Sequence, residues 1–335
     1  MMKKAFKRTL YLGYYFKKMN WRLLKKFLGH ASQLTGKSKP QLMLNSIRDV
    51  YKYNISILEY FQFGFYSKTE SEKKEWVGTG TIYEFQLKAN PIKERVILDD
   101  KRLFYKNYKE FFVHNIYTLE EIESNKINIE ELLENSRKLV LKQVDGKCGT
   151  GVKIINAKDY NKNHLLALMR KNNYGMIEDF IIQHTRMNML SPSAVNTIRI
   201  YTNINDAGDY ELLGCRIRIS VNCPVDNLAA GNLAAPIDER TGIIIGPGVY
   251  SDITKLPEEV HPITKVPIVG FQIPFWQEIL VMVKKASLKH PENKSIGWDI
   301  FVTEEGPGLI EGNHDWCKLV WQLPVNKGLK NLLNV

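Results

Sequence analysis

The sequence predicts a mixed α+β fold that follows a helical N-terminal region, and two observations support this. Beyond Lys138, short runs rich in β-branched and aromatic residues alternate with turn residues, whereas residues 41–75 carry helical periodicity. Stretches with helical periodicity also separate some of the strand-like runs, and no repeat of fixed period is present, so strands and helices mix in one fold. A hydrophobic fraction of 44% and a charged fraction of 25% over 335 residues exclude a disordered or collagen-like chain.

The N-terminus predicts a basic amphipathic helix over residues 3–29. Its apolar stripe follows helical spacing and consists of Leu12, Phe16, Met19, Leu23 and Phe27. Residues 1–40 hold eleven Lys and Arg and no acid, which leaves 36 Lys and Arg (47 less 11) and 36 Asp and Glu in the remainder. Such a helix over residues 1–30 either lies on an anionic membrane surface or packs on its own domain. The neutral remainder of the chain argues against a nucleic-acid partner.

After the helical pattern of residues 41–75, another helix is expected to begin near Asp99, where carboxylates favour a helix N-terminus. Two later helices are expected over Tyr160–Lys171 and Pro274–His290. The expected strands share β-rich composition bounded by turns; they are Leu139–Gln143, Val152–Ile155, Ile177–Ile182, Thr197–Thr202, Glu211–Ser220, Trp298–Thr303 and Leu309–Glu311.

A glycine-rich turn between two strands is the first candidate for binding chemistry. Residues 142–152 read K-Q-V-D-G-K-C-G-T-G-V and include Gly146, Gly149 and Gly151. Glycines let successive backbone N–H groups face one anion, and a strand on each side distinguishes this turn from the phosphate loops that open a helix. The pattern indicates a flap over a nucleotide triphosphate, with Lys142 directed at the phosphates. An ordinary Gly-rich hairpin is the alternative.

A hairpin over residues 298–313 is the candidate metal site. If it is symmetric about Glu305, Asp299 and Glu311 lie opposite each other, and Asn313 shares the face of Glu311. Two carboxylates about 5 Å apart repel by roughly 3 kcal/mol at an effective dielectric near 20, so a cation between them is favourable. Oxygen ligands of this kind select Mg²⁺ bound to substrate phosphates. A solvated hairpin with incidental acids is the alternative.

Arginines lie among apolar residues on two further strands. N-T-I-R-I-Y-T places Thr197, Arg199 and Tyr201 on one strand face, and C-R-I-R-I-S places Arg216 and Arg218 on another. A guanidinium keeps its proton, so a buried one requires a carboxylate or phosphate partner. Substrate binding and structural ion pairing both remain open.

Together these segments resemble the ATP-grasp superfamily, and more closely its sugar-transfer-associated branch, over roughly residues 96–313. The matching segments are L-D-D-K-R-L-F, the Lys142 strand with its glycine flap, M-I-E-D-F-I-I-Q-H, N-T-I-R-I-Y-T, R-I-R-I-S with V-D-N-L-A-A-G-N, and G-W-D followed by L-I-E-G-N. The resemblance implies an N-terminal region over 1–95, a small lobe with flap and hinge over 96–185, a large lobe over 186–325 and a tail over 326–335, the two lobes gripping ATP.

The resemblance also implies roles for individual residues. ATP would be held by Lys101, Lys142, Gly149, Gly151, the hinge residues Glu178, Asp179, Phe180 and Ile181, and His184, which stands where many relatives present an acid to the ribose. Mg²⁺, or Mn²⁺ in its place, would be bound by Asp299, Glu311 and Asn313. Arg199 or Arg218 would neutralise an acyl phosphate, and Arg216, Asp226 and Asn227 would contact substrate. The chain departs from the branch pattern at Asn232, which follows Gly231 where a second glycine is common.

These features favour an ATP-dependent ligase that joins a carboxylate and an amine through an acyl phosphate, in the synthesis of cell-surface polysaccharide such as capsule. A kinase of a sugar or polyol hydroxyl on the same fold is one alternative, and a non-catalytic nucleotide-binding membrane adaptor is another. Four cysteines without zinc spacing and no run of 18 apolar residues predict a cytoplasmic protein, peripheral on the inner face of the membrane if the N-terminal helix binds there.

Overall fold

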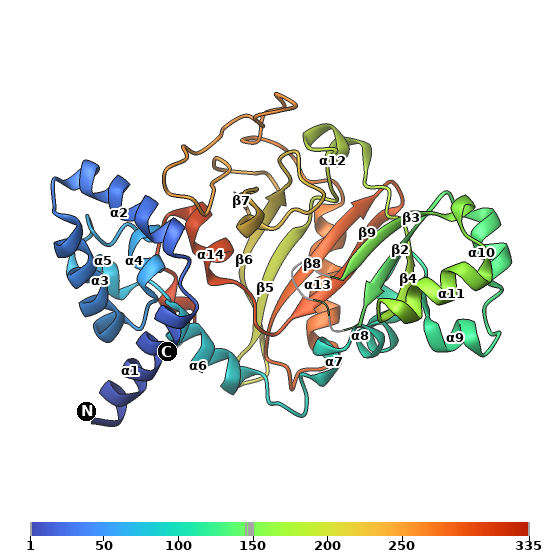
Figure 1. Cartoon of the computed structure of the whole chain (residues 1–335), viewed down its shortest axis with the longest axis horizontal. Helices are drawn as coiled ribbons and strands as arrows, with labels where there is room; N and C mark the ends of the chain where they lie inside the picture. Colours follow the sequence, from blue (N-terminus) through green and yellow to red (C-terminus); the bar gives the residue numbers. More distant parts are fainter. Residues whose placement is uncertain (1, 145, 147–150, 334–335) are drawn as a thin grey trace.

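The computed structural model describes residues 2–144, 146 and 151–333 in three adjoining parts (Figure 1). A helical region lies at one end, a lobe built on a five-stranded sheet lies in the middle, and a smaller lobe built on a four-stranded sheet lies at the other end. None of the helices that the structure describes is long and apolar enough to cross a bilayer.

The helical region buries its own aromatic core. Its helices are α1 (Met2–Lys17), α2 (Trp21–Thr35), α3 (Lys39–Tyr53), α4 (Ile57–Gln62), α5 (Glu70–Lys74) and α6 (Thr79–Ala89). The prediction of a single helix over residues 3–29 is wrong, because the first helix ends at Lys17 and a second begins at Trp21. The Asn20 side chain caps the second helix by accepting a hydrogen bond from the Leu23 N–H. The apolar stripe from Leu12 to Phe27 packs against the core that contains Tyr60 and Phe61. Of the two alternatives, a membrane surface or the protein's own core, these residues therefore contact the core.

The small lobe has an antiparallel sheet in the order β1-β4-β2-β3, with helices on one face (Figure 1). Leu139, Leu141, Ile155 and Ile177 point to those helices and form the core of the lobe. Its elements are β1 (Ile116–Thr118), α9 (Leu119–Glu123), α10 (Ile129–Asn135), β2 (Lys138–Gln143), β3 (Val152–Asn156), η2 (Ala157–Asp159), α11 (Lys162–Lys171) and β4 (Tyr174–Asp179). Before it in the chain lie α7 (Val96–Asp99), α8 (Lys101–Tyr108) and η1 (Lys109–Phe111); Phe104 and Tyr108 of α8 pack in the core of the large lobe.

The large lobe has an antiparallel sheet in the order β7-β6-β5-β8-β9. Alternation sends Ile198, Ile200, Ile217 and Ile300 to the face that packs on α13, so the intervening charged residues lie on the opposite face. Its elements are α12 (Thr185–Leu190), β5 (Ile198–Ile204), β6 (Tyr210–Ile219), η3 (Leu228–Ala230), β7 (Leu233–Ile237), α13 (Trp276–Lys289), β8 (Ser295–Thr303), β9 (Gly306–Asn313), α14 (Lys318–Gln322), η4 (Leu323–Val325) and η5 (Lys330–Leu333).

The sequence did not predict strands β1 and β7, and the predicted strand β4 lies too far toward the C-terminus. β1 has only three residues, and β7 lies in an Ala- and Pro-containing segment, so neither carries a strand-like run. β4 ends at Asp179, whereas the prediction extended this strand to Ile182, because the apolar residues after Asp179 belong to the linker between the lobes.

Buried polar contacts join the helical region to the large lobe. Lys318 on α14 forms a 2.7 Å ion pair with Glu59, and Gln322 exchanges two hydrogen bonds with the backbone of Val77. Asn90 donates to the carbonyl oxygens of Ser295 and His314. These contacts fix the helical region against the sheet that carries the candidate site.

Candidate nucleotide and metal site

The Asp299–Glu311 pair is the centre of the site. The two residues lie directly opposite each other on β8 and β9, as the sequence predicts. The turn itself is centred between Glu304 and Glu305, and a β-bulge after Asp299 shifts the register by one residue. The bulge therefore brings these two carboxylates into register.

The Asp299 carboxylate forms ion pairs with two arginines, one on β5 and one on β6. Arg199 makes a two-point ion pair with it through Nε and Nη2, the second contact measuring 2.8 Å, and Arg218 Nη2 donates to the same carboxylate at 2.9 Å. Asp299 is 1% exposed. Burial acts to raise the pKa of the Asp299 carboxyl, but the two guanidinium groups hold this pKa below its ordinary value. Asp299 therefore carries its negative charge at neutral pH.

Glu311 has the opposite tendency. Burial, reinforced by the neighbouring Asp299, raises the pKa of Glu311 above its ordinary value. Asn313 donates to Glu311 Oε1 at 3.2 Å and so lies within reach of the same carboxylate. A divalent cation would relieve the unfavourable burial of Glu311, and two carboxylates with an amide oxygen are ligands suited to Mg²⁺. The donor set therefore fits the metal.

A second charged cluster lies on the face of the small-lobe sheet that the helices leave uncovered. Lys142 Nζ lies 2.5 Å from Glu178 Oε2 on the adjacent strand, and His114 Nε2 lies 3.5 Å from the same oxygen. Burial acts to raise the pKa of Glu178, yet Lys142 and His114 lower it to about 2. His114 also packs edge-on against Phe301 of the large lobe, with ring centroids 5.3 Å apart. Lys142 is thus held at the junction of the two lobes.

Lys101 and the described ends of the flap lie close together. Asp100 caps α8 by accepting hydrogen bonds from the Arg102 and Leu103 N–H groups, which places Lys101 at the first helical position. The Lys101 ammonium donates to the carbonyl oxygen of Gly146, and its charge acts to lower the pKa of Glu311. Lys101 therefore contacts the described start of the flap and is near enough to Glu311 for the two charges to interact. Gly149, predicted to contact the phosphates, lies outside the described residues.

The backbone conformation at position 151 requires a glycine. Its φ is +71°, and a Cβ there would lie 2.3 Å from Oε1 of Gln143. The Gln143 N–H donates to the Gly151 carbonyl at 2.9 Å, so the two strands close on each other at this point.

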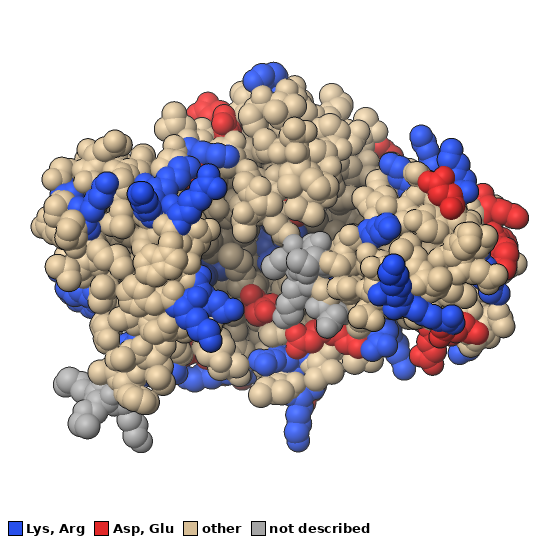
Figure 2. Space-filling model, viewed as in Figure 1, with Lys and Arg blue, Asp and Glu red and all other residues tan. Residues whose placement is uncertain are grey.

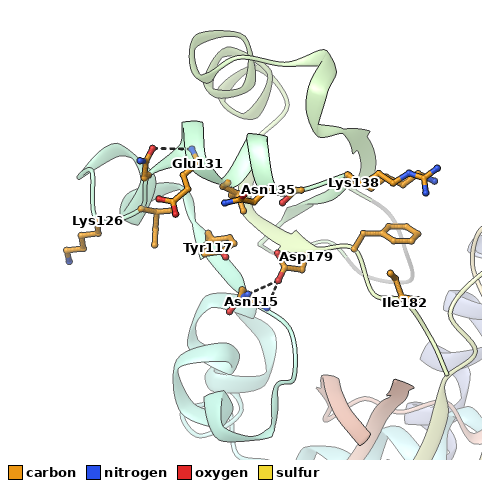
Figure 3. A pocket seen from close by; sticks show the side chains of 14 residues that line it. Asn115, Tyr117, Lys126, Glu131, Asn135, Lys138, Asp179 and Ile182 are labelled. Atoms are coloured by element: carbon orange, nitrogen blue, oxygen red, sulfur yellow. Dashed lines mark hydrogen bonds between the residues drawn. The ribbon is translucent and has the colours of Figure 1, made fainter. Parts of the chain in front are cut away.

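The hinge residues point in different directions. The Asp179 carboxylate accepts hydrogen bonds from the backbone N–H and side-chain amide of Asn115, at 3.0 and 2.8 Å. It faces a hollow of about 780 Å³ in the small lobe, also lined by Phe180 and Ile182 of the linker (Figure 3). This hollow contains none of Lys142, Glu178, Asp299 and Glu311, so it is a different place from the charged clusters.

His184 anchors the linker between the lobes. Its N–H donates to the Val302 carbonyl at 2.7 Å, its Nδ1 accepts from the Arg186 N–H, and its Nε2 lies 3.3 Å from Glu304. Ile181 lies half-buried in the same irregular segment. His184 thus joins the linker to the hairpin that carries Asp299.

The remaining predicted substrate residues separate into two groups. Asp226 and Asn227 lie beside Arg218: Asp226 accepts from the Thr197 N–H at 2.9 Å, and Asn227 Oδ1 accepts from Arg218 Nη1 at 3.2 Å. Arg216 instead donates to the carbonyl oxygens of Trp321 and Cys215, at 2.9 and 2.7 Å. The structure therefore brings Asp226 and Asn227 to the Asp299 cluster and turns the Arg216 head toward α14.

Sequence reasoning missed four side chains at the site. Val140, Val152 and Ile154 share the open face of the small-lobe sheet with Lys142, because each lies opposite a residue of that face, and Ile154 is 51% exposed. The fourth is His114. Outward apolar residues flanking a lysine in the flap strands were the available signal for the first three, whereas nothing local to His114 marks it.

Comparison with known proteins places these observations in a family. A family model described as sugar-transfer associated ATP-grasp matches residues 82–335. A search of curated protein sequences gave no match. Within the described residues no group of three or more His, Cys, Asp and Glu gathers as a metal site.

Solved structures similar to the chain include three ligases or synthetases. They are an ADP complex of N5-carboxyaminoimidazole ribonucleotide synthetase (9% identity, TM-score 0.40, covering 65% of this chain and 45% of that one), the ATP-grasp ligase PsnB with a precursor variant, Mg and ADP (10%, 0.44, 73% and 60%), and D-alanine–D-alanine ligase from Bacillus anthracis (17%, 0.37, 70% and 65%). The chain thus spans about half to two thirds of the length of these proteins. Because the family model covers most of the chain and includes both charged clusters, the protein belongs to the sugar-transfer-associated ATP-grasp family.

Proposed function

We propose that the protein is an ATP-dependent, ADP-forming ligase that joins a carboxylate to an amine through an acyl phosphate. The observation that carries this proposal is the Asp299–Glu311–Asn313 set with the charge of Lys101 acting on Glu311. The Lys142–Glu178 pair lies beside His114, which contacts Phe301 of the large lobe. Family membership supports ATP as the nucleotide. Val140, Val152 and Ile154 supply an apolar surface beside Lys142 for the adenine ring.

The proposed division of labour follows the charges. Lys101 and Lys142 bind triphosphate oxygens, and Asp299, Glu311 and Asn313 hold Mg²⁺, or Mn²⁺ in its place, which when bound neutralises charge on the phosphates. Arg199 and Arg218 both donate to Asp299, and Arg218 also donates to Thr197 and Asn227. The N–H groups of the two guanidinium groups that these bonds do not use are the proposed donors to an anionic acyl phosphate. Positioning and charge neutralisation supply the rate, as in other phosphoryl transfers.

The proposed substrates are a sugar acid or related carboxylate and an amine or amino acid, in the synthesis of a cell-surface polysaccharide. Support for this substrate class comes from the family description, which links these proteins to sugar transfer. Asp226 and Asn227 beside Arg218 are the proposed substrate contacts. Because ATP is the phosphoryl donor, the reaction is proposed to take place in the cytoplasm.

Hydroxylamine trapping tests the proposal. The purified protein is incubated with ATP, Mg²⁺, hydroxylamine and a panel of uronic and other sugar acids, and ADP and hydroxamate are measured together. A ligase forms the two in equal amounts, because hydroxylamine captures the acyl phosphate in place of the amine. A stable phosphomonoester without hydroxamate would identify a hydroxyl kinase instead, and ATP binding without ADP release across the panel would favour the non-catalytic adaptor.

A further inference from the structure

Helix α1 has two apolar faces, and only one of them is used within the protein. Tyr15 is buried, and Tyr11 and Leu12 pack against the same helical core. The other face carries Phe6, Leu10 and Tyr14, at successive spacings of four residues, and these are 67%, 58% and 56% exposed. Residues at this spacing line one side of a helix, so the three form a continuous exposed row on α1.

Trp21, the first residue of α2, is a fourth exposed apolar side chain in the N-terminal helices. It is 59% exposed, and its ring stacks on Phe16 with centroids 6.1 Å apart and an interplanar angle of 26°. The stacking holds the indole beside the C-terminal end of α1. We define Phe6, Leu10, Tyr14 and Trp21 as the outer stripe.

Exposed cations follow the outer stripe in the chain. Lys17, Lys18, Arg22 and Lys25 are exposed on α1, the connection to α2 and α2 itself. Some neighbouring cations are paired: Lys7 and Arg8 lie within 3.5 Å of Glu84, and Lys26 pairs with Asp252. On the face shown in Figure 2, the helical region at the left carries blue side chains and little red.

We propose that the outer stripe docks on an anionic lipid bilayer surface. Aromatic and aliphatic side chains enter the headgroup boundary, Trp and Tyr favour that depth, and Lys and Arg attract anionic headgroups. The charge identifies the occupant: residues 1–40 contain eleven Lys and Arg and no acid, so in a second copy of this chain the exposed Lys17, Lys18, Arg22 and Lys25 would face like charges. An anionic bilayer supplies the complementary charge.

The residues of the outer stripe differ from those of the apolar stripe that the sequence predicts. Leu12, Phe16, Met19, Leu23 and Phe27 pack on the core of the helical region, so removal of residues 1–30 would damage the fold. Substitutions confined to exposed positions avoid this difficulty. They also leave the nucleotide site unchanged, so the outcome is separate from that of the proposed enzyme activity.

The test is co-sedimentation of the full chain with vesicles of phosphatidylcholine alone or of phosphatidylcholine with phosphatidylglycerol, at low and high salt. The variants are Phe6→Glu/Leu10→Glu and Lys17→Glu/Lys18→Glu. The matched control is Val281→Glu/Leu288→Glu on α13, where the two residues are 54% and 43% exposed. Thermal unfolding and sedimentation velocity are measured for every variant.

We expect wild type and the α13 control to bind the anionic vesicles at least tenfold more tightly than the neutral ones. Binding should weaken strongly with salt, since the Debye length is about 8 Å at physiological ionic strength and shorter at higher salt. Both N-terminal variants should lose at least tenfold in binding while remaining folded. Lack of binding by intact protein at low salt would overturn the proposal, as would equal binding by the Phe6→Glu/Leu10→Glu variant. A wild-type dimer that this variant converts to a monomer, without vesicle binding, would identify a second copy as the occupant.

Discussion

Burial and the neighbouring Asp299 make the negative charge of Glu311 unfavourable in the protein without a cation. We expect Glu311→Gln to abolish Mg²⁺-dependent ADP formation, because a neutral amide removes one anionic ligand at nearly constant shape. The raised pKa of Glu311 means that the folded state holds its proton more tightly than the unfolded chain does, so ionisation lowers stability as pH rises from the unfolded pKa toward the folded one.

Metal-free Glu311→Gln should therefore unfold at or above the wild-type temperature at pH 7, as measured by calorimetry. Wild type should gain stability on addition of Mg²⁺ and ATP, and the variant should gain much less. ADP formation at the wild-type rate would contradict the metal assignment.

Glu178 contributes stability with the opposite pH dependence. Its folded pKa of about 2 lies below the unfolded value, so its contribution is fully present above about pH 5 and is lost as pH falls toward 2. A difference of this size corresponds to roughly 3 kcal/mol. We expect urea unfolding to show a steep loss of stability in this pH range for wild type and a shallower one for Glu178→Gln. Parallel pH profiles would show that the Lys142–Glu178 pair does not stabilise the fold.

Lys142 is expected to combine a structural and a binding role, which a double variant can separate. Lys142→Met leaves Glu178 buried beside only His114 and should cost about 3–5 kcal/mol of folding stability. Lys142→Met/Glu178→Gln removes both charges and should recover most of that loss. If Lys142 binds phosphate, the double variant still binds an ATP analogue at least tenfold more weakly in calorimetry. Wild-type affinity in the double variant would make Lys142 purely structural.

At the scale of elements, the cap of α8 sets the position of Lys101. Asp100→Ala removes the acceptor for two N–H groups and should lower stability by about 1 kcal/mol. Because Lys101 is the next residue, the same change should raise the KM for ATP severalfold. Asp100→Asn keeps the acceptor oxygen and is the matched control, with near wild-type values expected for both. An unchanged KM in Asp100→Ala would show that the cap does not position Lys101.

At the scale of the whole molecule, the packing of the N-terminal helices decides whether the helical region can be altered without loss of fold. Phe27 is fully buried, and Phe27→Ala should cost about 3–5 kcal/mol. Trp21→Ala removes a larger but exposed side chain and should change stability by less than about 0.5 kcal/mol. Denaturant unfolding monitored by circular dichroism measures both. Equal effects of the two changes would contradict the observed packing.

Much of the site was determined by local sequence. Alternation along a strand places Arg199 and Arg218 on polar faces, hairpin pairing places Asp299 opposite Glu311, and the glycine at position 151 coincides with a positive φ. Each of these predictions depends on residues within one hairpin or strand, where backbone geometry alone fixes relative position. The helices expected over Tyr160–Lys171 and Pro274–His290 are observed as α11 (Lys162–Lys171) and α13 (Trp276–Lys289), so their positions too depend on local sequence.

Only the tertiary structure decided which charges meet. Pairing between segments far apart in the chain brings Arg199 and Arg218 to Asp299 and brings His114 to Glu178. The same pairing directs Arg216 to the carbonyl oxygen of Trp321 instead. The N-terminal helices show the same division. Composition determined that they are basic and amphipathic, but two apolar faces were available, and packing against the aromatic core decided which one is buried. Period and spacing specify a face, whereas its partner is selected by the whole fold.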